Sequence, residues 1–258
     1  MKPLNGRRRP LVCMFDSGIG GINLLIGCSR AAPWADYCYF ADNYNVPYGN
    51  LTEGEIASRV FSVFENIAAL RPDAAVVACN TVTASCVSAL RKKFSFPVVG
   101  VEPAVKQAWE RGGRYLVLAT EATCSSASFA RLIRLYGKGA VICPCPSLAV
   151  QIENSIFSIC KNGPEDMPTP LEKQIVSSLP KGKFSSVVLG CTHYVFIKKF
   201  IENLYYCPVF DGISGTADHL RTLLGKNDHK LPCKGKIRFF CGDFSKNKAV
   251  FEKFRHFY

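Results

Sequence analysis

The amino-acid sequence predicts an α/β fold of two similar domains, each with a mostly parallel sheet covered by helices. Short apolar runs alternate with amphipathic stretches along the whole chain, which is the pattern of strands connected by helices. The apolar runs show little polar alternation, as is typical of strands that are buried on both faces. The alternation of strand and helix also starts a second time near the middle of the chain, which favours two domains.

The first half of the chain contains the first round of this pattern. Apolar runs predict strands at Leu11–Phe15, Tyr37–Phe40, Ala74–Ala78 and Pro97–Val101. Helical spacing predicts three helices, marked by Ile22, Leu25 and Ile26, by Ile56, Val60, Val63, Ile67 and Leu70, and by Val82–Leu90. A capping box from Thr52 to Glu55 begins the second helix, and Pro72 ends it.

The second half repeats the pattern. Strands are predicted at Tyr115–Ala119, Ala140–Cys143, Val187–Leu189 and Ile237–Phe240. Helices are predicted at Phe129–Tyr136, closed by Gly137, at Leu148–Cys160, at Leu171–Leu179, from the third strand through Phe200, and near Ala217–Leu224 and Asn247–Phe254. The polar segment Lys161–Pro170 holds three prolines and predicts a loop.

The composition is that of a globular protein. Of 258 residues, 48% are hydrophobic and 20% are charged, which excludes a disordered, collagen-like or coiled-coil chain. Apolar stretches without charge are shorter than the roughly 18 residues of a membrane span. The apolar run behind the basic start Met1–Pro10 is also shorter than a signal-peptide core. We therefore expect a cytoplasmic protein that does not bind a membrane.

The formal charge of +12 lies partly at the two ends of the chain. Lys2, Arg7, Arg8 and Arg9 are at the start. From Lys226 onward, the chain has nine Lys and Arg residues and three acidic residues, which gives this segment a net charge of +6. Such a surplus forms a solvated basic surface, or it attracts anions that range from a dicarboxylate to nucleic acid.

Thirteen cysteines are present, but they do not form a Cys-x-x-Cys motif. The nearest pair, Cys143 and Cys145, flanks a proline, and the four histidines are scattered. We therefore predict no metal site. Most of these cysteines are expected to be small buried hydrophobes, with two or three that take part in chemistry.

Two distant segments resemble each other. The segments 74–81 and 186–193 each run from a buried strand into a small residue, a cysteine and polar side chains. Ligands bind at the carboxyl ends of parallel strands, and a helix N-terminus lowers the pKa of a thiol. Taken singly, Cys79 and Cys191 read as packed thiols at strand ends. Taken together, they predict two thiols, one from each half, that face each other across a cleft between the domains.

Other polar groups follow predicted strands at the same edge. The glycine-rich turn after Asp16 offers backbone N–H groups to an anion, or allows tight packing, but Asn23 replaces the glycine that a dinucleotide fingerprint needs. Asp16 is placed to accept or relay protons. His193 reads as an acid/base partner or as a helix cap. The segment 41–49 is predicted to be a connecting loop, and Glu153 is predicted to be a solvated helix residue.

Together these segments resemble the glutamate racemase family, among the cofactor-independent aspartate/glutamate racemases. The resemblance rests on segments 16–21 (DSGIGG), 47–49 (PYG), 79–81 (CNT), 97–103 (PVVGVEP) and 190–194 (GCTHY), in the family's order and spacing, and the tail 242–244 (GDF) is also similar. It implies a discontinuous first domain at 1–100 and 212–258, and a second domain at 101–211. No cofactor is implied.

The resemblance also implies roles for individual residues. Cys79 would take the α-proton from D-glutamate and Cys191 from L-glutamate, one acting as thiolate and the other as thiol. The helper groups that it implies are Asp16, His193 and Glu153. The substrate-binding residues that it implies are Asp16, Ser17, Pro47, Tyr48, Gly49, Asn80, Thr81, Thr192 and His193. The chain departs from the family pattern at Val195, Phe129, Ala119 and 43–45.

The function that the resemblance implies is supply of D-glutamate to peptidoglycan, and hence to the cell wall and cell shape. A homodimer is expected, and some relatives are reported to restrain DNA gyrase. Two alternatives stay open at the level of sequence. One is a related enzyme that acts on aspartate, a hydantoin or another small acidic substrate. The other is a basic protein that binds nucleic acid or another partner.

Overall fold

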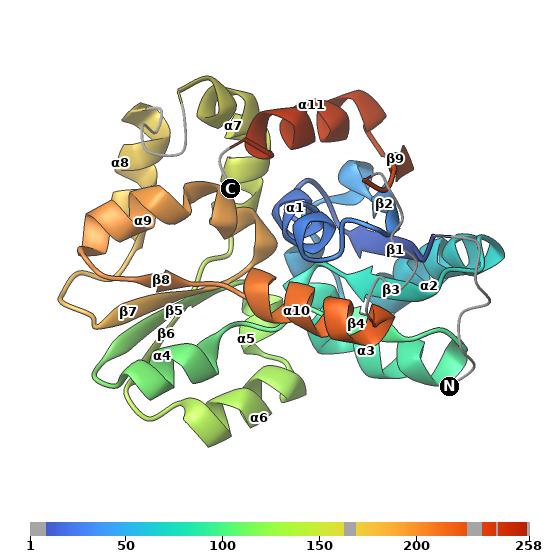
Figure 1. Ribbon diagram of the computed structural model, residues 1–258. Helices are drawn as coiled ribbons and strands as arrows, with labels where there is room; N and C mark the ends of the chain where they lie inside the picture. Colours follow the sequence, from blue (N-terminus) through green and yellow to red (C-terminus); the bar gives the residue numbers. More distant parts are fainter. Residues whose placement is uncertain (1–8, 163–168, 226–233, 241, 257–258) are drawn as a thin grey trace.

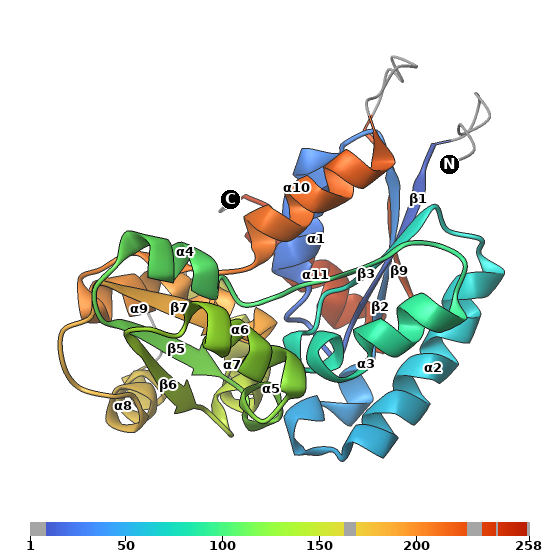
Figure 2. The same ribbon diagram turned by 90° about the horizontal axis from the view of Figure 1, so that it is seen from below.

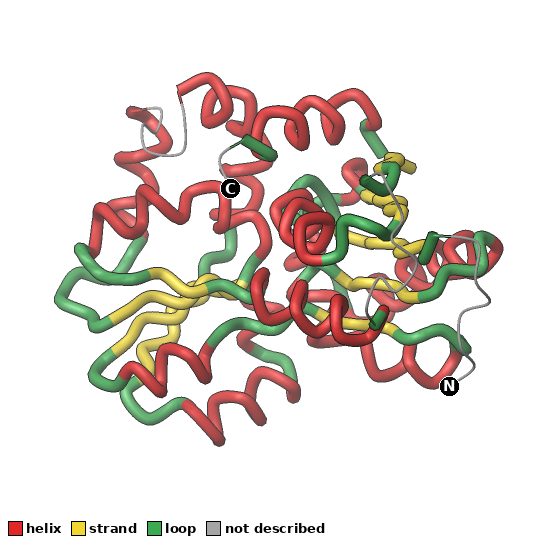
Figure 3. Tube along the Cα trace, in the orientation of Figure 1, coloured by secondary structure: helices red, strands yellow, loops and turns green. Residues whose placement is uncertain are grey.

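The computed structural model describes residues 9–162, 169–225, 234–240 and 242–256. In this part of the chain, two separate sheets are each covered by helices (Figures 1 and 3). Every strand pair in both sheets is parallel. The predicted α/β fold class is therefore confirmed.

The first sheet has five strands in the order β4-β3-β1-β2-β9. They are β1 (Leu11–Asp16), β2 (Asp36–Ala41), β3 (Ala74–Val77), β4 (Val98–Gly100) and β9 (Ile237–Phe240). Phe15 and Val77 pack in one apolar layer, while Met14 and Val76 pack in the layer on the other face. Both layers are buried, which explains why these strands are unbroken apolar runs in the sequence.

The second sheet has four strands in the order β6-β5-β7-β8. They are β5 (Tyr115–Ala119), β6 (Ala140–Pro144), β7 (Ser186–Gly190) and β8 (Val209–Phe210). Leu116 and Leu189 belong to the same apolar core as Met14 of the first sheet. The two sheets are thus joined by a continuous buried layer.

Helices cover both faces of each sheet. Those against the first sheet are α1 (Ile22–Ala31) and α10 (Ile213–Leu224) on one face and α2 (Glu53–Ala69) and α3 (Asn80–Lys93) on the other. Those against the second sheet are α4 (Val105–Arg111) and α6 (Ala127–Tyr136) on one face and α7 (Leu148–Asn162), α8 (Thr169–Ser178) and α9 (Lys198–Tyr205) on the other. Short helices complete the fold: η1 (Asn43–Asn45), η2 (Tyr48–Asn50), α5 (Glu121–Cys124) and η3 (Thr192–Ile197).

The C-terminal segment returns to the first sheet. Strand β9 pairs in parallel with β2 at the edge of that sheet. The last helix, α11 (Phe244–Phe254), then packs against α1 of the first half and α7 of the second (Figures 1 and 2). This path agrees with a discontinuous first domain, while the boundaries at 100 and 212 stay a prediction.

Some predicted elements differ in detail. Leu70 lies beyond the end of α2 and is 39% exposed, and Phe64 fills the buried position of that stripe. The helix predicted through Phe200 is divided into η3 and α9. Several short elements were not predicted. Helix α4 buries only Val105 and Ala108, β8 is two residues long, and η1, η2 and α5 are three or four residues long, so their sequences show no clear hydrophobic period.

Parts of three other predictions lie outside the described residues. They are Lys2, Arg7 and Arg8 of the basic start, 163–168 of the predicted loop, and 226–233 of the basic tail. Of that loop, Lys161 and Asn162 end α7, and Thr169 and Pro170 begin α8. Among the described helices, none is long and apolar enough to cross a membrane.

Candidate active site

The two cysteines singled out by the sequence line one buried cavity. Cys79 follows β3 and precedes α3, and Cys191 follows β7 and precedes η3. They are 6% and 7% exposed. Because β3 and β7 belong to different sheets, each half of the molecule contributes one thiol to the same space.

Most of the predicted binding residues also line this cavity. They are Ser17, Pro47, Tyr48, Gly49, Thr81, Thr192 and His193. Asp16 and Glu153 do not line the cavity, but they contact Thr192 and His193, which do. Asn80 lines two neighbouring cavities. Thr120 and Glu121 also line the cavity, although the sequence reasoning did not select them. They follow β5 as Cys79 follows β3, so the strand-end rule would have found them.

The cavity has a volume of about 20 Å³. That is room for about one water molecule. Across it, the Thr81 hydroxyl lies 3.1 Å from the Thr120 hydroxyl, which joins the first half to the second. In this arrangement the cavity is therefore closed to a molecule as large as an amino acid.

Cys79 lies in a dry environment beside a carboxyl group. Its sulfur is 3.5 Å from Ser17 Oγ. Burial, together with the charge of Asp16, raises the pKa of Cys79 to about 12. In this closed arrangement Cys79 is a thiol, which is the form that donates a proton.

Asp16 joins the first half to the loop that carries Cys191. It is fully buried, and its Oδ1 accepts a hydrogen bond of 2.8 Å from the Gly18 backbone N–H. Its Oδ2 accepts a hydrogen bond of 3.1 Å from the Thr192 hydroxyl. Burial raises the pKa of Asp16 above its ordinary value, although the charge of His193 opposes the shift.

Cys191 is the first member of a chain of polar contacts. Its sulfur lies 3.9 Å from His193 Nδ1, and His193 Nε2 lies 2.7 Å from Glu153 Oε2. Burial acts to lower the pKa of His193, but its contacts with Cys191 and Glu153 raise that pKa well above its usual value. Both directions favour an imidazolium paired with a carboxylate, with Nδ1 of the ring toward the Cys191 sulfur.

Reading Glu153 as a solvated helix residue is wrong. The residue is 6% exposed, because α7 directs its side chain between the halves toward His193. Burial acts to raise the pKa of Glu153, but hydrogen bonds and charges from His193 and Lys246 lower it to about 2. Lys246 was not predicted from the sequence. It lies two residues beyond the tail segment 242–244 that took part in the resemblance.

The glycine-rich turn serves close packing. A Cβ atom at Gly20 would collide with Thr192 Oγ1 and would lie 2.9 Å from the His193 backbone nitrogen. The N–H groups of Gly18 and Ile19 donate to Asp16 and Glu153, so carboxylates of the chain itself occupy these donors. Of the two readings of this turn, the structure supports tight packing.

The loop after β2 closes one side of the cavity. Tyr48 is 1% exposed, and its hydroxyl donates a 2.7 Å hydrogen bond to Asp42.

Among the described residues, no group of three or more His, Cys, Asp and Glu side chains is arranged to hold a metal ion.

Comparisons with known proteins assign the family. The chain matches a family model described as Asp/Glu/Hydantoin racemase over residues 28–220. It is 36% identical to glutamate racemase 2 of Bacillus subtilis over 234 residues, which cover 88% of this chain and 86% of that one. The chain therefore belongs to the Asp/Glu/Hydantoin racemase family, and the resemblance seen in the sequence is confirmed.

Solved structures agree with this assignment. A glutamate racemase isoform from Bacillus anthracis is 27% identical, with a TM-score of 0.80 over 96% of this chain and 94% of that one. Escherichia coli glutamate racemase, in complex with L-glutamate and the activator UDP-MurNAc-ala, is also 27% identical. Its TM-score is 0.79 over 95% of this chain and 96% of that one.

The contact between Gly20 and the Thr192–His193 turn generates a prediction about stability. Gly20→Ala should lower the free energy of unfolding by about 1–3 kcal/mol, because the new methyl group overlaps backbone as well as side chain. Gly54→Ala in α2 is the matched control, since a Cβ there meets nothing within 4 Å. It should raise stability by up to about 1 kcal/mol. Urea denaturation of both variants measures this, and equal midpoints would contradict it.

Proposed function

We propose that this chain is a glutamate racemase that interconverts L- and D-glutamate with two cysteines and no cofactor. The observation that carries the proposal is the placement of Cys79 and Cys191, from two different sheets, on one buried cavity. Inversion at the α-carbon needs a base on one face and an acid on the other, and two opposed thiols supply both.

In the direction from L-glutamate, Cys191 removes the α-proton as a thiolate. The imidazolium of His193 lies beside the Cys191 sulfur and stabilises that negative charge. The Cys79 thiol then donates a proton to the opposite face of the carbanion. Its raised pKa keeps this proton available until the carbanion forms.

In the direction from D-glutamate the roles are exchanged. Cys79 must then become the thiolate, with Ser17 as its hydrogen-bond partner. Asp16 is close enough to influence the pKa of Cys79, and as a buried carboxyl with a raised pKa it is suited to share the proton. Glu153 assists the opposite side through His193.

Substrate binding is proposed for residues that line the cavity or lie next to it. These are Asp16, Ser17, Pro47, Tyr48, Gly49, Asn80, Thr81, Thr192 and His193. Hydroxyl and amide donors there would stabilise the charge that develops on the substrate carboxylate as the α-proton leaves. The similarity to racemases named for glutamate favours that substrate over aspartate.

The biological part of the proposal follows from the resemblance. D-glutamate made by this chain would enter peptidoglycan, and the protein would act in the cytoplasm as a homodimer. Contact with DNA gyrase or nucleic acid stays a prediction that rests on the basic surplus and on the family.

The direct test is racemisation of glutamate by the purified protein. Circular dichroism should show each enantiomer converting to the racemate, after chelator treatment and without added pyridoxal phosphate. The value of kcat/KM for glutamate should exceed that for aspartate by more than about tenfold, a transition-state difference of about 1.4 kcal/mol. Comparable values would point to a relative of broad specificity, and no racemisation of either would contradict the proposal.

The roles of the two thiols generate the next prediction. Cys79→Ser and Cys191→Ser should each abolish racemisation, because a serine hydroxyl is too weak an acid to form the base at neutral pH. Each variant should keep a half-reaction. With 3-chloroglutamate, loss of the α-proton and chloride gives an enamine, which hydrolyses to 2-oxoglutarate and ammonia.

Cys79→Ser should eliminate chloride from the L analogue, and Cys191→Ser from the D analogue. Release of 2-oxoglutarate measures both reactions. A serine variant that still racemises glutamate nearly normally would show that its cysteine is only a packed thiol.

A further inference from the structure

The C-terminal helix α11 delivers one charged side chain to the interior of the site. Lys246, in its first turn, places Nζ 2.8 Å from Glu153 Oε1 and 3.4 Å from the Glu153 backbone oxygen. The lysine side chain is 21% exposed and the Glu153 side chain 7%, so this ion pair is largely shielded from water. Such a pair is much stronger than one at the surface.

The start of α11 is held firmly in place. Asp243 accepts the Lys246 backbone N–H at 2.9 Å and caps the helix. Asn43 accepts a 2.9 Å hydrogen bond from Asn247 and donates one of 3.4 Å to Glu153. Gly242 has a φ of +59°, and a Cβ there would overlap Asn43 Oδ1 and the Ala41 carbonyl. The tail segment and the unusual Asn43 thus serve one purpose, which is to dock Lys246 against Glu153.

The two carboxylate oxygens of Glu153 have separate partners. Oε2 faces His193 Nε2 at 2.7 Å and accepts the Ile19 N–H at 3.2 Å. Oε1 faces Lys246 and Asn43. Glu153 therefore connects α11 to the histidine beside Cys191. The contacts of the Lys246 ammonium group described above are both with Glu153, on the Cys191 side of the site.

Lys246 is one of the two cationic partners that lower the pKa of Glu153, and Glu153 is the partner of His193. A buried carboxylate with a single cationic partner tends to take the proton from that partner, because the neutral pair avoids the cost of burying two charges. A second cation makes Glu153 a weaker base, so the proton stays on His193. Only the protonated ring presents both an N–H and a positive charge to Cys191.

We propose that Lys246 is a positioning residue for the Cys191 side of the reaction, since it keeps Glu153 ionised and His193 protonated next to the Cys191 sulfur. This inference rests on the proposed function. It makes α11 part of the machinery for proton removal from L-glutamate, and it leaves the Cys79 side to Asp16 and Ser17.

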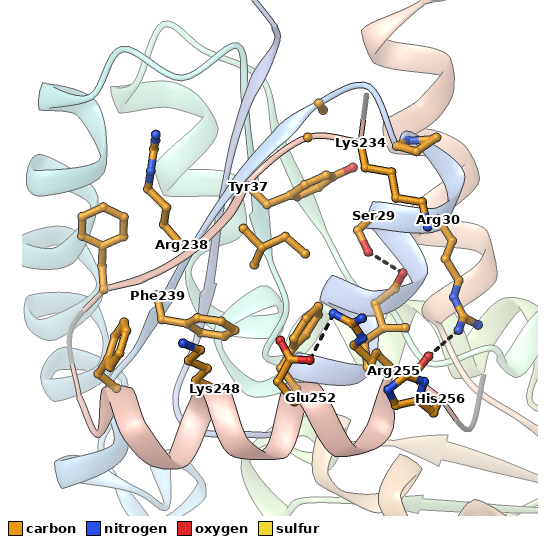
Figure 4. Close-up of a pocket in the computed structure, with 18 residues that line it drawn as sticks. Ser29, Arg30, Tyr37, Lys234, Arg238, Phe239, Lys248, Glu252, Arg255 and His256 are labelled. Atoms are coloured by element: carbon orange, nitrogen blue, oxygen red, sulfur yellow. Dashed lines mark hydrogen bonds and ion pairs between the residues drawn. The ribbon is translucent and has the colours of Figure 1, made fainter. Parts of the chain in front are cut away.

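The same helix offers a matched control. Lys248, two residues further on, lines a groove of about 1120 Å³ between α1, β9 and α11, and Figure 4 shows its ammonium group beside Phe239 in that groove. Lys248 is exposed. Replacement of Lys248 by Met removes one positive charge from α11 without changing the contacts of Glu153.

The experiment uses 3-chloroglutamate to measure proton removal by Cys191 and proton removal by Cys79 separately. In the Cys79→Ser background, Lys246→Met should lower elimination from the L analogue by about tenfold, which corresponds to about 1.4 kcal/mol of transition-state stabilisation lost with the charge of Lys246. In the Cys191→Ser background, the same change should alter elimination from the D analogue by less than about twofold. Lys246→Arg should restore most of the L-side rate, and Lys248→Met should leave both rates unchanged.

An equal loss on both sides would mean that Lys246 serves only structure, and no loss on the L side would mean that its charge is not needed. Either result overturns the inference. If Lys246→Met does not fold, Lys246→Gln gives the same comparison, because it keeps a hydrogen-bond donor but not the charge. Wild-type protein is measured in parallel to distinguish failure of the inference about Lys246 from failure of the proposed function. A wild type without racemase activity refutes the proposed function itself.

Discussion

Burial of the Glu153 carboxylate between the two halves is the constraint on which the site depends. A charge in that position is stable only if donors surround it, and here they come from the turn after β1, from η3, from the loop after β2 and from α11. Each of these segments must therefore hold its hydrogen-bond donor at a fixed position next to the Glu153 carboxylate. The same contacts that satisfy Glu153 orient His193, and His193 in turn faces Cys191.

The two thiols are placed in different electrostatic surroundings. Cys79 has a buried carboxyl group nearby and a pKa raised to about 12. Cys191 has an imidazolium nearby, supported by an ionised carboxylate. An enzyme that works in both directions still begins each turnover with one thiolate and one thiol. In the proposed mechanism, the neighbouring His193 suits Cys191 to remove the α-proton from L-glutamate.

The sequence predicted the strands and the strand-end cysteines well, because both have local signals. Apolar runs such as 74–78 identify buried strands, and the echo between 74–81 and 186–193 identified both thiols. The contacts that complete the site are not local. Glu153 and Lys246 are 93 residues apart, and only packing of α11 against α7 brings them together. The residue pattern around Glu153 therefore predicted a solvated side chain, and no local pattern pointed to Lys246.

The central claim is that two thiols act on opposite faces of the α-carbon, and proton exchange in D₂O tests it most directly. According to this claim, Cys191 takes the α-proton from L-glutamate and Cys79 delivers deuterium from solvent. Mass spectrometry after chiral separation, at early times, should find deuterium in the D-glutamate formed and protium in the remaining L-glutamate. D-glutamate that keeps the original proton would show that one group both removes and returns it, and would contradict the claim.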